Sequence, residues 1–73
     1  MRKGTIRTAS AYDDCVTVEV DDGSRRELHE GNRATLEEFN QEAELIRDGR
    51  NWMLRGNATS EYLGGVPVAI YLA

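Results

Sequence analysis

The chain has 73 residues and a formal net charge of −4 at pH 7, with 13 acidic side chains against 9 lysines and arginines. This length provides for one hydrophobic core, so we expect a single compact domain over residues 1–73. The single cysteine excludes an internal disulfide and is typical of a reducing compartment, and no apolar run is long enough to span a membrane. No hydrophobic stretch follows "MRKGTIRTAS", so we predict no signal peptide and a cytoplasmic location.

Three strands are predicted in the first part of the chain. The first covers about Lys3–Ala9, with weak alternation of polar and apolar residues. "CVTVEV" gives the clearest strand, because its three valines point to one face and Cys15, Thr17 and Glu19 to the other. "DDG" then indicates a hairpin turn into a third strand.

The register of this hairpin follows from the need for one apolar face. A two-residue loop would divide the apolar residues between the two faces of the hairpin. A three-residue loop, with Gly23 in the left-handed conformation, sets Val16 opposite Leu28 and Glu19 opposite Arg25. We predict the second register, in which Arg26 lies beside Val18 and covers the edge of the sheet with its aliphatic stem.

The segment "TLEEFNQEAELIRDG" predicts an amphipathic helix from Thr35 to Gly49. Thr35 and the glutamate three residues later form a capping box, and Gly49 suits the residue after the helix end. An apolar stripe of Leu36, Phe39, Ala43 and Ile46 would face the sheet, with acidic residues on the opposite side. Leu45 does not fit this stripe, so a loop covers it or it forms an exposed contact point; we favour cover.

The last part of the chain predicts two further strands. "NWMLRG" places Trp52 and Leu54 on one face and Met53 on the other. Residues 57–65 fit either a single helical turn or a loop. "VPVAIYLA" closes the chain as a strand that lies at a sheet edge or begins there, because Pro67 cannot donate a ladder hydrogen bond. The predicted fold class is α+β: an antiparallel sheet of about five strands with one amphipathic helix on one face, in the order β-β-β-α-β-β.

Catalysis and metal binding find little support in the sequence. The one histidine, His29, lies opposite Cys15 in the predicted register, and a pair of this kind can activate a thiolate. A chance pairing at the end of the hairpin explains it better, and two ligands do not make a structural zinc site. We therefore predict a protein that is not an enzyme and has no cofactor or metal.

The acidic residues are concentrated in the middle of the chain. Residues 13–48 carry twelve acids against four arginines, a net −8, whereas the segments before and after are weakly basic. Capping and solubility explain part of this acidity. We predict that the remainder contacts a basic partner, because such a surface repels nucleic acids and attracts cationic proteins.

In size, acidity, lone-domain architecture and lack of catalytic residues, the chain resembles the small acidic proteins that phages and mobile elements use against host defences, the anti-CRISPR and anti-restriction proteins. The resemblance implies a non-catalytic inhibitor in the host cytoplasm. Such an inhibitor docks its carboxylates, in place of nucleic-acid phosphates, on the basic site of a nucleic-acid-handling protein or nucleoprotein complex. Reversing the charge of Glu37, Glu44 and Asp48 is then expected to weaken binding without unfolding the protein.

The predicted contact residues comprise a helical set, two pairs of turn residues and two apolar anchors. They are Glu37, Glu38, Gln41, Glu42, Glu44 and Asp48 on the helix, Asp13, Asp14, Asp21 and Asp22 in turns, and Leu45 and Tyr71 as anchors.

Two alternatives belong to other functional classes. The first is a small nucleic-acid-binding domain, which would use Arg2, Lys3, Arg7, Arg25 and Arg26. The second is a homo-oligomeric subunit, possible as a homodimer, in which the terminal strand pairs with a copy of itself through residues 69–72.

Overall fold

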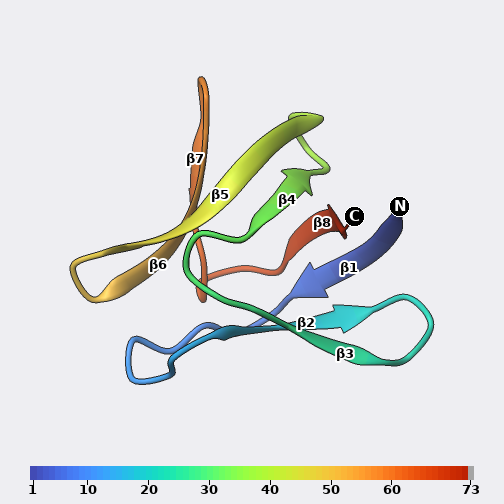
Figure 1. Cartoon of the computed structure of the whole chain (residues 1–73), viewed down its shortest axis with the longest axis horizontal. Helices are drawn as coiled ribbons and strands as arrows, with labels where there is room; N and C mark the ends of the chain where they lie inside the picture. The colour runs from blue at the N-terminus through green and yellow to red at the C-terminus, as the bar shows by residue number, and fades with distance from the viewer. Residues whose placement is uncertain (73) are drawn as a thin grey trace.

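A computed structural model, in which residues 1–72 are described, contains one antiparallel sheet of eight strands (Figure 1). The strands are β1 (Arg2–Ile6), β2 (Val16–Val20), β3 (Arg25–Leu28), β4 (Arg33–Leu36), β5 (Gln41–Asp48), β6 (Asn51–Gly56), β7 (Ser60–Tyr62) and β8 (Val68–Leu72). Their order across the sheet is β3-β2-β1-β8-β4-β5-β6-β7. The sheet therefore consists of local hairpins joined at the centre by the pairing of the first strand with the last.

The predicted β2–β3 hairpin is confirmed in its register. Val16 pairs with Leu28, Val18 with Arg26, and Glu19 with Arg25. Gly23 has a φ of 90°, the left-handed conformation that the three-residue loop requires. Two side-chain oxygen contacts close the turn, since the Asp22 carboxylate accepts hydrogen bonds from the Ser24 amide at 2.9 Å and the Ser24 hydroxyl at 2.5 Å. This hairpin is thus specified by short-range signals.

The prediction of an α+β fold is wrong, because the segment from Thr35 to Gly49 forms strands and residues 1–72 contain no helix. The strands β4 and β5 pair with each other, Ala34 lying opposite Ala43. In the strand, Ala43 and Leu45 point into the core and are completely buried. The helix would have left Leu45 far from its apolar stripe, so pairing of β5 with β4 and β6 provides the better burial.

Turn residues at both ends of β5 also favour the extended form. Asn40 has a φ of 48° in the turn that joins β4 to β5, a conformation that asparagine tolerates better than most residues. Gly49 has a φ of 62°, and Asp48 pairs with Asn51 across a two-residue loop. A positive φ at the first loop residue is typical of a type II′ hairpin turn. The glycine predicted to end a helix therefore begins a hairpin.

Residues 57–65, which the sequence left open, contain the short edge strand β7 between bends. The final strand β8 begins just after Pro67, as one of the two predicted possibilities required. It does not lie at an edge, however, because Ile70 pairs with Gly4 of β1 on one side and with Leu36 of β4 on the other. The edges of the sheet are β3 and β7.

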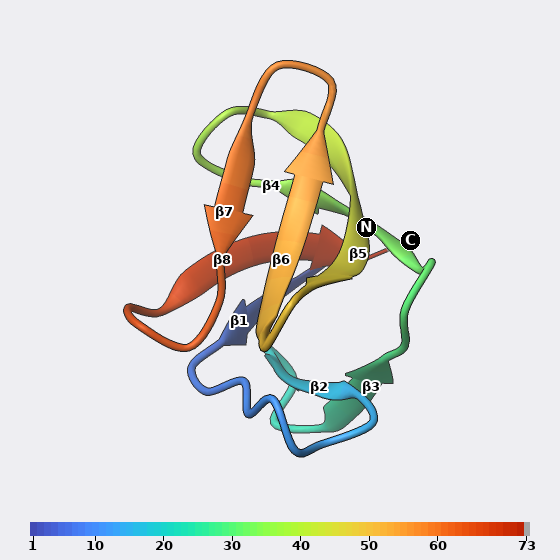
Figure 2. The same cartoon turned by 90° about the vertical axis from the view of Figure 1, so that its left-hand side faces the viewer.

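The sheet is strongly curved around one core. In Figure 2, β6 and β7 run nearly vertically, β8 runs nearly horizontally, and the β2–β3 hairpin lies below them. Every strand except β7 contributes buried apolar side chains, and Leu63, just after β7, completes the cluster. Gly4 permits the close approach of β1, because a Cβ atom there would lie 2.5 Å from Cγ1 of Val18. No charged or polar residue among residues 1–72 is buried.

Contacts from β5 and β6 hold the long loop between β1 and β2. The Trp52 indole N–H donates to the carbonyl of Ser10 at 3.0 Å, and the Arg47 guanidinium donates to the carbonyls of Ala11, at 2.7 Å, and Asp13. The guanidinium carbon also lies 4.2 Å from the centre of the Trp52 ring, a cation–π arrangement. These contacts connect β5 and β6 to the loop between β1 and β2, on the other side of the central strands.

Across residues 1–72, the structure contains no helix with the length and apolar character needed to cross a bilayer.

Candidate functional site

The four aspartates of the predicted contact set lie in turns, as predicted, but the carboxylates predicted to share one helix face are divided between a turn and a strand. Asp13 and Asp14 are in the β1–β2 loop, Asp21 and Asp22 in the β2–β3 turn, Glu37 and Glu38 in the β4–β5 turn, and Glu42, Glu44 and Asp48 on the outer face of β5. Gln41 lies on the other side of β5, where its side-chain oxygen accepts from the Ala58 amide at 3.3 Å. The β4–β5 turn and the alternation along β5 separate the residues that a helix would have gathered.

Several of these acids are also neutralised within the chain. Arg2 lies 3.4 Å from Asp21 and 3.3 Å from Asp22, Lys3 lies 3.2 Å from Glu37, and Arg33 lies 2.5 Å from Glu42. These partners are exposed, so each pair contributes little to stability, but it does reduce the local charge. Two of the five carboxylates predicted for one helix face, Glu37 and Glu42, thus have a cation partner, which reduces the acidic surplus expected there.

Most of the basic residues considered for nucleic-acid binding also have a partner of opposite charge. Besides the pairs formed by Arg2 and Lys3, Arg7 donates to Glu19 at 2.9 Å. Arg25 and Arg26 lie on the edge strand β3, where both are exposed, and Arg25 is opposite Glu19, the partner of Arg7. Three of the five cations thus already have carboxylate partners, which reduces the field available to attract phosphates.

A groove of about 440 Å³ lies between the β4–β5 turn and the connection from β7 to β8. Its apolar lining includes the buried side chains of Leu36 and Val68 and the exposed side chains of Phe39 and Val66. Phe39 is 47% exposed and Val66 is 63% exposed. A phenylalanine and a valine left in water beside a concave surface are typical features of a binding site.

Three glutamates also line this groove. The Glu37 carboxylate forms an ion pair with Lys3, and the Glu37 backbone amide donates to the carbonyl of Ala69 at 3.1 Å. Glu38 and Glu61 form no ion pair with any of residues 1–72. The groove is therefore apolar with two free carboxylates. We call it the Phe39 groove and define it by Leu36, Glu37, Glu38, Phe39, Glu61 and residues 66–69.

The two predicted apolar anchors have different positions. Leu45 is completely buried in the core and cannot contact a partner, so the expectation that it is covered is confirmed, although by the sheet itself. Tyr71 is half-buried and lies opposite Lys3 on one neighbouring strand and Thr35 on the other. Neither Phe39 nor Val66 was predicted as a contact residue. Helical spacing predicted that Phe39 faces the sheet, and Val66 was assigned to the final strand, whereas it precedes β8.

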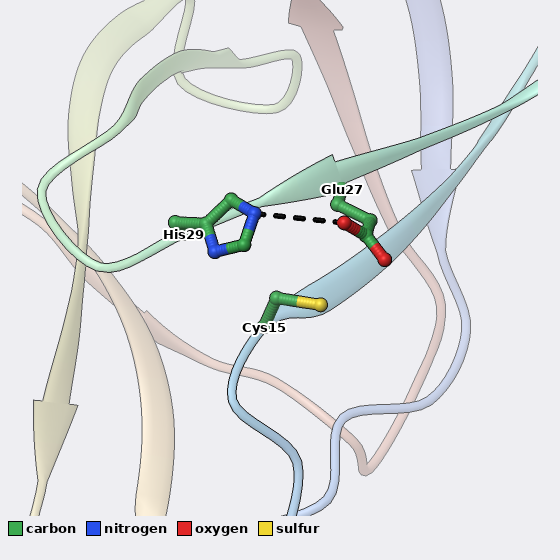
Figure 3. A group of neighbouring side chains, drawn as sticks. All are labelled: Cys15, Glu27 and His29. Carbon is green, nitrogen blue, oxygen red and sulfur yellow. Dashed lines mark ion pairs between the residues drawn. The ribbon is translucent and has the colours of Figure 1, made fainter.

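The structure places Cys15 and His29 together, as the hairpin register predicts, and adds Glu27 (Figure 3). One ligand atom from each of these three residues lies within 4.8 Å of the other two. The Nε2 atom of His29 is 3.6 Å from Oε1 of Glu27. Glu27 and His29 are exposed and Cys15 is half-buried, so the group is accessible from solvent.

The environment of Cys15 favours the protonated thiol. Partial burial raises the pKa of Cys15 above its ordinary value, and the Glu27 carboxylate raises this pKa further by its charge and by accepting a hydrogen bond. A thiolate nucleophile needs the opposite shift, as beside a cation or a helix N-terminus. The pair of Cys15 and His29 is therefore poorly arranged for nucleophilic chemistry.

Comparisons of the chain with protein-family models, with curated proteins and with solved structures found no match.

Proposed function

We propose that this domain is a protein-binding module that takes up a basic and apolar segment of a partner in the Phe39 groove. The observation that carries the proposal is the exposed Phe39 and Val66 beside the unpaired carboxylates of Glu38 and Glu61. An aliphatic or aromatic side chain of the partner would fill the apolar part of the groove. An adjacent lysine or arginine would then lie near the two carboxylates.

The proposed partner is a basic protein or nucleoprotein complex, and the proposed effect of binding is inhibition without catalysis. The net charge of −4 supports a cationic partner, since complementary charge raises association rates and suppresses wrong contacts. We place the protein in the cytoplasm, because a single free cysteine fits a reducing compartment. The proposed contact uses fewer carboxylates than the predicted imitation of a nucleic-acid backbone, because it consists of two carboxylates and an apolar groove.

A peptide array tests this proposal directly. Each peptide carries one leucine or phenylalanine, flanked in one series by arginines and in a matched series by glutamates. We expect the labelled domain to bind the arginine series, and to bind it more weakly as the salt concentration rises. Preference for the glutamate series, or equal binding of both, contradicts the proposal.

Variants then locate the contact on the peptides that bind. Phe39→Ala is expected to weaken binding by about 2 kcal/mol, the loss typical of a central aromatic contact. Glu38→Lys and Glu61→Lys should reduce affinity and its dependence on salt. Glu44→Lys is the matched control, because Glu44 carries the same charge on the outer face of β5 outside the groove. If Glu44→Lys has the larger effect, the contact lies on β5 instead.

A homo-oligomer through the terminal strand is not proposed, because residues 69–72 already pair with β1.

A further inference from the structure

We infer that Cys15, Glu27 and His29 form a binding site for one zinc ion on the outer face of the β2–β3 hairpin. Glu27 lies in β3, Cys15 directly before β2 and His29 directly after β3, and the three side chains lie together (Figure 3). The site is independent of the Phe39 groove, with which it shares no residue.

The hairpin register explains why these residues meet. Glu27 and His29 are two positions apart on one side of the hairpin, so their side chains project from the same face. Val16 pairs with Leu28, which sets the preceding Cys15 beside the following His29. The same register pairs Thr17 with Glu27, one alternation further along that face. Only Glu27 lies within a strand, while Cys15 directly precedes β2 and His29 directly follows β3, so the pairing of Val16 with Leu28 brings these two residues together.

The spacing of the donor atoms suits a tetrahedral ion. Zinc binds sulfur at about 2.3 Å, imidazole nitrogen at about 2.0 to 2.1 Å and carboxylate oxygen at about 2.0 to 2.2 Å, which separates neighbouring ligand atoms by about 3.3 to 3.8 Å. The His29 nitrogen and the Glu27 oxygen are already 3.6 Å apart. The three ligand atoms lie within 4.8 Å of one another, so rotation of exposed side chains is enough to close the set.

The donor types select the ion. A thiolate and an imidazole favour zinc and similar transition metals, whereas magnesium and calcium prefer oxygen ligands throughout. Three protein ligands leave one tetrahedral position for water, and this position faces solvent because Glu27 and His29 are exposed. Bound zinc would connect β2 to β3, an edge strand that pairs on one side with β2.

The test is titration of the untagged, reduced protein with cobalt(II), followed by displacement with zinc. Cobalt(II) reports both geometry and ligand type, through visible bands of tetrahedral cobalt and a near-ultraviolet thiolate-to-cobalt charge-transfer band. We expect both signals to saturate at one equivalent and to disappear when zinc is added. An octahedral spectrum, or the absence of saturable binding, overturns the inference.

Variants identify the ligands. Cys15→Ser, His29→Gln and Glu27→Gln are each expected to weaken binding by more than about 100-fold, since loss of an outer partner of a ligand alone costs 10- to 100-fold. Glu30→Gln is the matched control, because Glu30 is a neighbouring exposed carboxylate outside the group, and its binding should not change. Circular dichroism of the metal-free variants checks that each remains folded. Unchanged affinity in any of the three ligand variants, or equal loss in Glu30→Gln, overturns the assignment.

Discussion

The hairpins β2–β3 and β4–β5 are both antiparallel pairs, but their sequences specify them differently. In β2–β3, alternating valines, an aspartate-glycine turn and opposite charges at Glu19 and Arg25 all support one register. In β4–β5, capping residues and an apolar stripe at helical spacing favour a helix, yet the chain is extended. The first hairpin follows from local signals, whereas β4 of the second also pairs with β8, a strand far away in the sequence.

The difference shows how burial decides between two plausible local structures. The helix would place Phe39 and Ile46 in the core and leave Leu45 outside, whereas the strand buries Leu45 and leaves Phe39 exposed. As a strand, β5 forms backbone hydrogen bonds with both β4 and β6. A helix would instead satisfy its backbone groups internally and would not pair with these strands. Helix propensity is worth only tenths of a kcal/mol for each ordinary residue, so such tertiary pairing overrides it.

The largest predicted effect separates these two structures directly. Leu45→Ala should lower the free energy of unfolding by about 2 to 5 kcal/mol, because it leaves a cavity at a completely buried position. Phe39→Ala should lower it by less than about 1 kcal/mol, because about half of this side chain is already exposed. Urea denaturation followed by Trp52 fluorescence measures both. The reverse order of the two losses would indicate a helix.

A second prediction concerns β1, the strand that joins β2 to β8 at the centre of the sheet. Gly4→Ala should cost about 1 to 3 kcal/mol, because its Cβ atom would lie 2.5 Å from Val18 and 3.3 Å from the carbonyl oxygen of Glu19. Gly65→Ala is the control, since a Cβ atom there meets no atom within 4 Å. Thermal unfolding should separate the two variants clearly. A loss in Gly65→Ala as large as in Gly4→Ala would refute this account of β1.

The smallest predicted effect concerns the acid dependence of the β2–β3 turn. Hydrogen bonds from Ser24, with a smaller contribution from the charge of Arg2, hold the pKa of Asp22 below its ordinary value of 3.8. Because the folded pKa is lowered, the carboxylate stabilises the fold above the unfolded pKa and loses this contribution as the pH falls through the folded pKa. The stability difference between the parent chain and Asp22→Asn should therefore shrink in acid.

Urea denaturation from neutral pH down to pH 2 measures that difference. Asp14→Asn serves as the control, since its side chain forms no hydrogen bond or ion pair with any of residues 1–72. A constant difference for Asp22→Asn over the whole range would show that the turn does not depend on this carboxylate.

Much of the sheet was predictable, because β1, β2, β3, β6 and β8 follow from alternation and turn residues. The central position of β8 was not, since sequence patterns do not show which distant strand is a neighbour. The helix was wrong because capping residues and turn residues overlap: Gly49 and Arg50 match a helix end and also a two-residue hairpin loop. Leu45 was the one signal against the helix.

The candidate sites divide in the same way. The meeting of Cys15 and His29 follows from the hairpin register, and the same register extended by two residues would have included Glu27. The Phe39 groove was not predictable, because it lies between two connections that are distant in the sequence. The positions predicted for Glu37, Glu38, Glu42, Glu44 and Asp48 were wrong because they depended on the helix, whereas the four aspartates lie in turns as predicted.

The pairing of β8 between β1 and β4 has a consequence for synthesis of the protein on the ribosome. Arg2 lies opposite Leu72, so the emerging chain has no partner for the inner edges of its two hairpin groups until β8 is released (Figure 1). Until then both groups expose unpaired strand edges and apolar faces, the features that lead to aggregation. Chaperone demand should therefore be greatest for nascent chains that end just before Val68.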